Sequence, residues 1–504
     1  MTLISFDFFA FLLITLLLFY LIKPLQKYVL LAASMYFYFA ISKTSVTTWK
    51  LAALTLCVFA VTYGGALLIE RAKGKAKGVI LGFCITALVA MLFAIKYAYN
   101  VCTLVLSIVR VSGDFSWMKL AAIIGISYYA LSAIGYLTDV SWGNCKAAKN
   151  PVDVLLFVFF FPVIVSGPVI RFKDMNEQFN TRRSLSYDNI AMGARRMAWG
   201  YFKKLVISER FGAVVMTVYG GYNEYGTLTI VIATLCYAVE LYTDFSGCMD
   251  IIIGAAMLFG IKLPENFRAP FFSETIQEFW QRWHITLGMW FKDYVMYPLQ
   301  KSSTVQKIGK FSKKKFGKKF GKKVPFYISM LVLWILIGIW HGGTDYYFVA
   351  SAGIPCALLI LSDVLKPLAD RTNKALRINK EREIWKTLRR IRTLLLICIC
   401  WVVACSGSMA NAIGIFVHMF MSITKFVPVS TLFVQCGLDV FDVLVMAIGL
   451  LVLLITDMLT QKGTSIFEVG DKKPVLKTIL IYAEILTIFF AGEVGASSFI
   501  YFQF

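Results

Sequence analysis

Charged residues are scarce in this sequence, and their scarcity excludes most soluble folds. Only 16% of the 504 residues are charged and 59% are hydrophobic, whereas soluble domains are about one quarter charged. Apolar runs long enough to cross a bilayer recur from end to end. Lipid cannot satisfy backbone donors and acceptors, so spanning segments are helices or closed barrels, and continuous apolar runs favour helices. We therefore expect an all-α polytopic membrane protein.

The residues of most metal centres and soluble hydrolases are also missing. The chain has three histidines, and its eleven cysteines form no CxxC pair, so we predict no metal site, disulfide frame or resident cofactor. It contains no GxSxG, GxxxxGK[ST] or HExxH motif, and no GxGxxG after a strand. These absences argue against a soluble enzyme of those classes.

Acidic residues are outnumbered by basic ones, 29 to 51, which gives a formal charge of +22. The basic residues gather in short breaks between apolar runs, a pattern typical of cytoplasmic loops. We therefore expect contact with anionic lipid and no nucleic-acid partner. The basic breaks are 70–78, 144–151, 171–183, 301–323 and 366–392.

The segment 301–323 is the most basic of these breaks, with ten lysines and no acid. The pattern favours a positively charged loop that lies against anionic headgroups. Recruitment of an acidic donor or carrier protein at the cytoplasmic face is the alternative.

We predict 11 to 14 membrane-crossing helices, with further helices that lie at the interface or re-enter. The first run, about 6–22, lacks a basic start and a clear cleavage site, so we expect it to be a retained span. The whole chain, 1–504, is expected to form one integral membrane domain, with N-terminal helices (1–150), a catalytic core (151–422) and C-terminal helices (423–504). The absence of inverted internal repeats weighs against a transporter.

The segment 244–300 combines acids, aromatic residues and a histidine between two apolar runs. We expect a helix over 276–294, on which Trp280 and His284 share a face, as do Glu278 and Arg282. Trp283 and Trp290 would stack two turns apart. Such a helix is too polar to span, so it is expected to lie flat or to re-enter the membrane.

Two acids, Glu240 and Asp244, stand four residues apart at the end of an apolar run. Acids inside a membrane are energetically expensive and are candidates for function. The alternative is structural pairing, for which the sequence offers three cations, Arg268, Arg282 and Lys203.

His341 follows about 16 apolar residues, which places it about 24 Å from the basic edge at Pro325. Gly342 and Gly343 are expected to end the helix there. A neutral imidazole is well suited to accept a proton from a hydroxyl, although a buried histidine bonded to a carbonyl remains an alternative. His418 has no polar neighbours in sequence and is expected to be structural.

Several longer motifs occur together in one order. They are "GISYYALSAIGYLTDV" (125–140), "FFPVIVSGPVIRF" (160–172), "GYFKKLVISERF" (200–211), "DFSGCMDIIIGAAMLFGIKLPENFRAPF" (244–271), "EFWQRWHITLGMWFKDYVMYPL" (278–299), "GIWHGG" (338–343) and "FIYFQF" (499–504). In these motifs the chain resembles the membrane-bound O-acyltransferases, on the bacterial branch of alginate and peptidoglycan O-acetyltransferases and teichoic acid D-alanyl transfer proteins. The chain departs from that branch in lacking a proline before "GISYY" and in having Cys405 where many relatives have arginine.

The resemblance implies a ring of helices around a central funnel, in which an acyl group passes from a cytoplasmic thioester to an acceptor at the opposite face. It also implies that His341 is the essential catalytic residue and His284 the second. We expect His341 to act as general base, and His284 to orient a substrate or share the proton relay. Five further residues are expected to line the site: Trp340, Trp283, Arg282, Asp244 and Asn266.

The leading hypothesis is a multi-pass O-acetyltransferase of the bacterial cytoplasmic membrane. It would use acetyl-CoA and serve a polysaccharide of the envelope or a secreted one, through an extracytoplasmic esterase-like (SGNH) partner. The alternative is D-alanyl transfer from the phosphopantetheine thioester of an acidic carrier protein. A proton-coupled transporter and a structural scaffold are the remaining classes.

Overall fold

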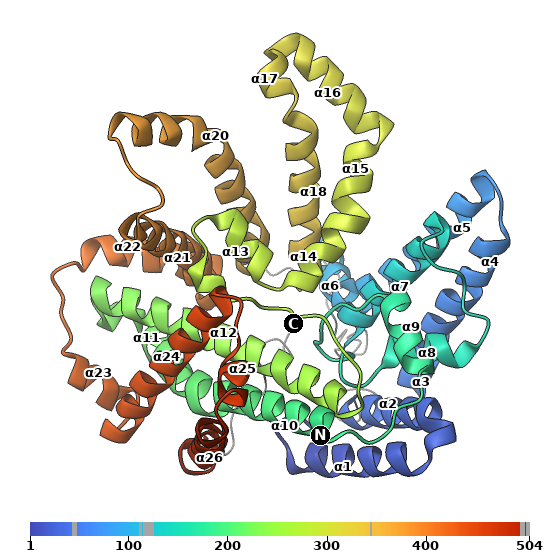
Figure 1. The fold of residues 1–504 in the computed structure, drawn as a ribbon. Helices are drawn as coiled ribbons and strands as arrows, with labels where there is room; N and C mark the ends of the chain where they lie inside the picture. The colour runs from blue at the N-terminus through green and yellow to red at the C-terminus, as the bar shows by residue number, and fades with distance from the viewer. Residues whose placement is uncertain (43–47, 110–112, 114–124, 343–344, 494–498, 500–504) are drawn as a thin grey trace. The chain divides into compact units, whose positions relative to one another are not determined.

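The computed structural model describes the chain except for residues 43–47, 110–112, 114–124, 343–344, 494–498 and 500–504. Its regular structure is helical throughout the described ranges (Figure 1), apart from one isolated antiparallel bridge between Phe267 and Trp283. The predicted all-α class is confirmed.

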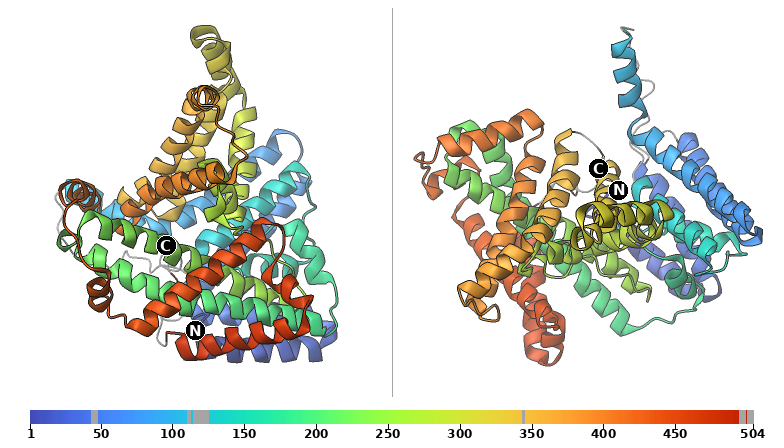
Figure 2. Two further views of the ribbon diagram at one scale, coloured as in Figure 1. Left: turned by 60° about the vertical axis from the view of Figure 1, so that its left-hand side comes forward. Right: turned by 90° about the horizontal axis from the view of Figure 1, so that it is seen from above.

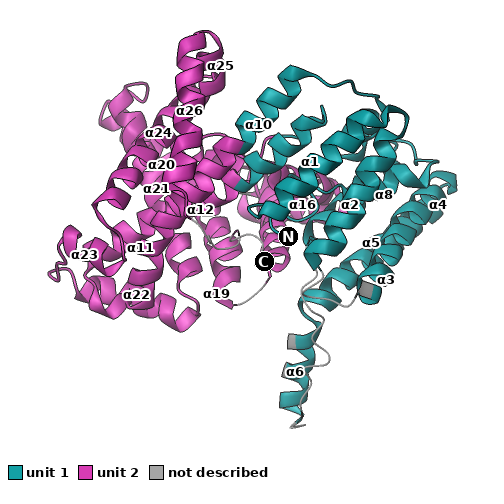
Figure 3. Ribbon diagram, turned by 90° about the horizontal axis from the view of Figure 1, so that it is seen from below, with its two compact units in different colours: residues 1–197, 248–264 teal, residues 198–247, 265–504 magenta. Residues whose placement is uncertain are grey.

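The described chain divides into two compact units (Figure 3). The first comprises residues 1–197 and 248–264, and the second comprises 198–247 and 265–504. The long helix α12 (Thr227–Leu258) contributes its first part to the second unit and its end to the first. All candidate site residues belong to the second unit. The predicted ring of helices and the predicted single domain stay predictions.

The first unit is built around α7 (Ile126–Trp142), whose residues from Ile126 to Val140 are all buried. Gly125 precedes this helix with a φ of +86°, a conformation that side chains disfavour. A Cβ at Gly125 would lie 2.1 Å from the carbonyl oxygen of Ile164, so the backbones approach closely there. The other α-helices are α1 (Phe6–Leu21), α2 (Gln26–Ser42), α3 (Thr48–Phe59), α4 (Gly65–Arg71), α5 (Lys75–Lys96), α6 (Ala98–Ile108), α8 (Pro151–Phe159), α9 (Phe172–Asn180) and α10 (Tyr187–Tyr201).

The second unit contains the remaining helices. Along the chain they are α11 (Glu209–Gly220), α13 (Ile276–Arg282), α14 (Ile285–Phe291), α15 (Tyr297–Lys301), α16 (Ser303–Phe316), α17 (Lys318–Gly321), α18 (Val324–His341), α19 (Asp345–Phe348), α20 (Ile354–Ala375), α21 (Glu383–Cys405), α22 (Met409–Met421), α23 (Val429–Gln435), α24 (Val440–Gln461), α25 (Ile466–Asp471) and α26 (Pro474–Ala491). Short π-helical turns η4 (Phe202–Ser208), η7 (Lys292–Met296) and η8 (Val349–Gly353) join several of them.

Seven helices of the described chain are long and apolar enough to cross a membrane, or eight if the bent pair Phe6–Leu21 and Lys23–Ser42 is one span. This is fewer than the 11 to 14 predicted, because several apolar runs do not form one long helix. The run 152–170, for example, is helical only as far as Phe159. The seven are Trp49–Arg71, Lys75–Lys96, Thr227–Leu258, Val324–His341, Asp345–Ala375, Val440–Gln461 and Pro474–Ala491.

The lysine-rich segment 301–323 forms helices rather than the predicted loop. Helices α16 and α17 make a hairpin at the N-terminal end of α18 (Figures 1 and 2). Val305, Gly309 and Ser312 form the buried side of α16, and a Cβ at Gly309 would meet the ring of Pro325 at 2.6 Å. The lysines of α16 are exposed, so the hairpin presents a basic surface at this end of α18.

Candidate active site

His284 occupies a break between two short helices. It follows α13 and caps the N-terminus of α14 with a left-handed backbone, φ +48°. The prediction of one helix over 276–294 is therefore wrong, and Trp283 and Trp290 are not on a common helical face. The predicted contact between Glu278 and Arg282 is confirmed, since their side chains form an ion pair of 2.5 Å.

Asn266 fixes this left-handed turn with its side-chain oxygen. The oxygen accepts hydrogen bonds from the backbone N–H of Thr286 at 3.1 Å and from the Thr286 hydroxyl at 2.9 Å, and it lies 3.2 Å from Nδ1 of His284. Its backbone carbonyl also accepts from the N–H of Ile285. Asn266 is 1% exposed, so these bonds are protected from water.

The contacts of Asn266 determine which nitrogen of His284 carries the proton. The N–H of Thr286 is an unambiguous donor, so the atom it contacts on Asn266 is the oxygen. An amide oxygen only accepts, and therefore Nδ1 of His284 donates to it. In the neutral ring, Nε2 then holds the lone pair. Burial lowers the pKa of His284 well below its usual value, and the nearby His341 lowers it further.

The depressed pKa predicts that His284 stays neutral when the pH falls from 8 to 5.5. In the unfolded chain this histidine takes up a proton near its ordinary pKa of about 6.5. The unfolded state then binds more protons than the folded state, so this group lowers the free energy of unfolding as the pH drops below that value. NMR spectra of histidine-labelled protein, with His284→Gln used for assignment, measure the titration directly.

Asn266→Asp provides the matched control, because it keeps the acceptor and adds a negative charge beside Nδ1. The carboxylate favours the imidazolium, so the pKa of His284 rises in this variant. A wild-type His284 that titrates with an ordinary midpoint would contradict the assignment.

His341 ends α18, and Gly342 continues from it with a φ of +113°. The predicted helix end is confirmed, while Gly343 lies outside the described residues. Trp340 packs near both histidines: its ring centroid is 4.9 Å from that of His341 and 6.3 Å from that of His284. His284 also packs against Phe245, at 4.8 Å. All of these rings are buried.

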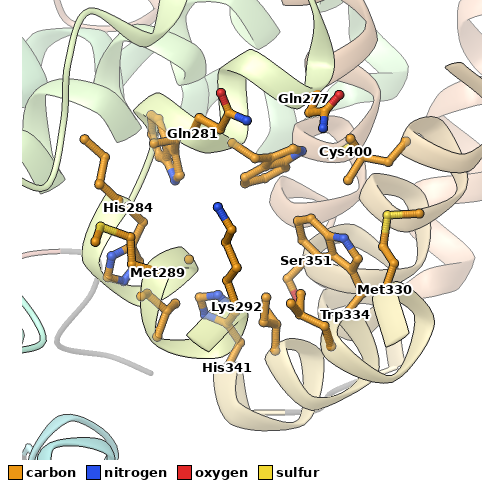
Figure 4. A pocket seen from close by; sticks show the side chains of 18 of the residues that line it. Gln277, Gln281, His284, Met289, Lys292, Met330, Trp334, His341, Ser351 and Cys400 are labelled. Carbon is orange, nitrogen blue, oxygen red and sulfur yellow. The ribbon is translucent and has the colours of Figure 1, made fainter. Parts of the chain in front are cut away.

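Both imidazoles line one cavity of about 560 Å³ inside the second unit. Figure 4 shows their rings at one side of it, with Lys292 beside His341. The wall is largely apolar and aromatic, and it includes Trp280, Trp283, Trp334, Trp401, Met289, Met296 and Met330. Its polar side chains other than the histidines are Lys292, Gln277, Gln281, Gln300, Ser351, Tyr237, Tyr297 and Tyr347.

The cavity follows the length of α18. Six of its lining residues lie at helical spacing on one face of that helix: Phe326, Met330, Leu333, Trp334, Ile337 and His341. Fifteen residues separate the first from the last, which corresponds to about 22 Å. Phe326 lies three residues beyond Lys323, and Gln300 on the opposite wall precedes Lys301. The cavity therefore extends from the lysine-rich hairpin to the histidines.

The five additional residues predicted to line the site have different surroundings in the structure. Trp283 lines the cavity, while Trp340 packs against both histidines and Asn266 holds His284. Arg282 does not line it and instead pairs with Glu278 and bonds Gln461.

Asp244 lies in a buried ion pair rather than in the cavity wall. Its carboxylate is 2.7 Å from Nζ of Lys204. The pairing partner is Lys204, the neighbour of the predicted Lys203, which itself donates to Ser246. Both lysines lie in the π-helical turn η4, and sequence spacing alone did not resolve which of them faces Asp244.

Lys292 and the three glutamines of the wall were not among the predicted site residues. A signal for Lys292 exists in the sequence, because it is a cation within the aromatic-rich stretch "MWFKDY". Among the described residues, no group of three or more His, Cys, Asp or Glu side chains is arranged to hold a metal ion.

Comparison with known proteins agrees with this arrangement. Residues 114–312 match the model of the membrane-bound O-acyltransferase family. Over this range the chain is similar to that family. The matched range includes His284 and the whole of α12, whereas His341 lies beyond it.

Three similar proteins are instructive. The chain is 33% identical over 297 residues to the probable alginate O-acetylase AlgI of Pseudomonas syringae, a match that covers 59% of this chain and 51% of the relative. It is 31% identical over 257 residues to the peptidoglycan O-acetyltransferase of Helicobacter pylori, or 45% of each chain. It is 30% identical over 233 residues to the teichoic acid D-alanyltransferase of Streptococcus thermophilus, or 44% of this chain and 53% of the relative. The matches span about half the length of these relatives.

Proposed function

We propose that the chain is a membrane O-acyltransferase that takes an acyl group from a cytoplasmic thioester and transfers it to a hydroxyl of an envelope or secreted polysaccharide. The observation that carries this proposal is the cavity that extends from the lysine-rich hairpin to His341 and His284. A span of about 22 Å accommodates an extended pantetheine arm, and the wall along it is largely apolar and aromatic. The match of residues 114–312 to the membrane-bound O-acyltransferase model and the names of the relatives support this reaction.

In the proposed reaction, His341 accepts the proton of the acceptor hydroxyl while the oxygen attacks the thioester carbonyl. A tetrahedral intermediate forms, and the C–S bond then breaks. The proton held by the imidazole returns to the sulfur, so the products are an ester and a free thiol. His284, neutral and with its lone pair on Nε2, orients the acceptor hydroxyl or shares the proton relay. Asn266 is its positioning residue.

Acetyl-CoA is the proposed donor, and an extracytoplasmic esterase-like protein is the proposed partner that delivers the acetyl group to the polymer. The two acetyltransferase relatives support this choice. D-alanyl transfer from an acidic carrier protein is the second candidate. It is favoured by the exposed lysines of the hairpin, which are complementary to an acidic surface. In both cases the proposed location is the bacterial cytoplasmic membrane.

Inverted membrane vesicles that contain the full chain distinguish the donors. Their outer face is the cytoplasmic one, so labelled acetyl-CoA and labelled D-alanyl carrier protein can be supplied in turn. Base-labile label that depends on His341 is expected from acetyl-CoA. Label from the carrier protein alone would show that the reaction is D-alanyl transfer and not acetyl transfer. Label from neither donor would contradict the proposal that the chain is an acyltransferase.

Gly288 offers a direct way to obstruct the cavity. It lines the wall, and a Cβ at this position would meet only the Trp280 carbonyl oxygen, at 3.8 Å. Gly288→Phe is therefore expected to fold while its ring fills the path beside His284, and to lower transfer by about 100-fold through displacement of the donor. Initial rates in the vesicle assay measure this effect.

Gly288→Ala is the matched control, since a methyl group fits and favours the helix. It is expected to keep near wild-type transfer. Equal rates for the phenylalanine and alanine variants would show that the donor does not use this cavity.

A further inference from the structure

Lys292 is the one lysine or arginine among the described residues that line the cavity, and no aspartate or glutamate accompanies it there. Its side chain is exposed, and Figure 4 shows it beside the His341 imidazole, pointing toward the side of Gln281. Its Nζ lies 5.5 Å from the ring centroid of Tyr297, the first residue of α15. A lone cation on an apolar wall implies a negatively charged species at some stage of binding or reaction.

The position of Lys292 along the cavity indicates which species that is. One wall runs from His284 through Gly288, Lys292 and Met296 to Gln300, next to the lysine-rich hairpin. Lys292 follows His284 by eight residues, so its backbone lies about 12 Å nearer to the hairpin. A donor arm that enters from the hairpin places its acyl carbonyl at the histidines and its sulfur on the side of Lys292. The acceptor hydroxyl approaches from beyond the histidines.

We propose that Lys292 binds the sulfur of the acyl donor and stabilises its negative charge as the C–S bond breaks. This inference rests on the proposed function. The tetrahedral intermediate collapses, the bonding electron pair leaves with sulfur, and the thiolate forms an ion pair with the Lys292 ammonium. The thiolate then takes the proton that the histidine accepted from the acceptor hydroxyl, so the free thiol is released and the lysine remains protonated.

The chemistry requires such a group because sulfur leaves as an anion into an apolar cavity. An ordinary thiol has a pKa of about 8.5, so its conjugate base is not negligible near neutral pH. An unpaired thiolate in this wall would be strongly disfavoured, whereas a charge-assisted contact with an ammonium is among the stronger polar interactions. Lys292 is therefore a catalytic residue that acts on the leaving group, separate from the base that acts on the acceptor.

The test measures binding of the product thiol rather than turnover. Pantetheine, whose thiol is its one ionisable group near neutral pH, is bound to the purified full chain at pH 7 and at pH 9. The thiolate fraction rises over this interval, so wild-type affinity is expected to increase about tenfold, a typical ratio for gain of one charge-assisted contact. Lys292→Met is expected to lose this increase, and Lys292→Arg to keep it.

Two controls separate Lys292 from its surroundings. S-methyl pantetheine cannot ionise and is expected to bind wild type and Lys292→Met equally at both pH values. Lys301→Met removes a neighbouring charge that does not line the cavity and is expected to keep the increase. The other titratable side chains of the wall are present in every variant: His284, His341, Tyr237, Tyr297, Tyr347 and Cys400.

Each outcome is decisive. An increase of equal size in wild type and Lys292→Met would overturn the role of Lys292 while leaving the donor cavity intact. No binding of either pantetheine compound to wild type would overturn the proposed function itself. Loss of the increase in Lys292→Met, with S-methyl pantetheine binding unchanged, would support the proposal and show that the variant is folded.

Discussion

His341→Ala is expected to lower acyl transfer by about 1,000-fold, the middle of the range that a general base contributes. The variant removes the imidazole at the end of α18, while the helix and its Gly342 terminus remain. Envelope material from cells that carry the variant should release no acyl group on mild base treatment. Initial rates in membrane vesicles give the magnitude.

His418→Ala is the matched control for the loss of a histidine. Its Nε2 lies 2.8 Å from the carbonyl oxygen of Tyr225, and it does not line the cavity. Transfer is expected to stay near the wild-type rate in this variant. Ester release that persists in His341→Ala, at equal protein abundance, would contradict the catalytic assignment and favour a structural role for the site.

Asp244→Ala is expected to destabilise the second unit by about 3 kcal/mol, because it leaves the Lys204 ammonium buried with fewer partners. The side chains of Asp244 and Lys204 are 0% and 1% exposed. Glu209 remains 2.6 Å from the same ammonium, so the expected loss of stability is at the lower end of the range for a broken buried ion pair. Thermal unfolding of the detergent-solubilised chain measures it.

The double variant Asp244→Leu with Lys204→Met tests the physical reason. Removal of both charges is expected to restore most of the lost stability, since apolar residues of similar size can replace a buried ion pair. A stable Asp244→Ala variant that has lost transfer would instead place the carboxylate in the chemistry, as the sequence-based hypothesis did.

Much of the helical architecture could be predicted from the sequence, because apolar length determines helices in lipid. The end of α18 at His341 followed from the glycines after it. The number of long helices could not be counted in this way: apolar runs such as 152–170 are broken by turns that carry no strong sequence signal. The lysine-rich hairpin was missed because its charges resemble those of a loop, although their spacing also suits a helix with one buried face.

The candidate site was predictable in its two histidines and not in its geometry. The left-handed backbone of His284 is uncommon for a residue with a side chain, and it depends on hydrogen bonds that Asn266, eighteen residues away, accepts. Periodicity assumes a continuous helix, whereas Trp280 lies in α13 and His284 at the break after it, although both line the cavity. Arg282 and Asp244 were polar residues in an apolar context, which marks structural ion pairs as readily as function.

The central claim is that the donor arm occupies the cavity along α18, with its acyl carbon at the histidines. A structure of the full chain with a non-cleavable ketone analogue of acetyl-CoA tests this most directly. The account predicts density for the pantetheine arm along the face from Phe326 to Ile337, with the ketone carbon within contact distance of His341. An analogue bound outside this cavity, or with its ketone remote from both histidines, would contradict it.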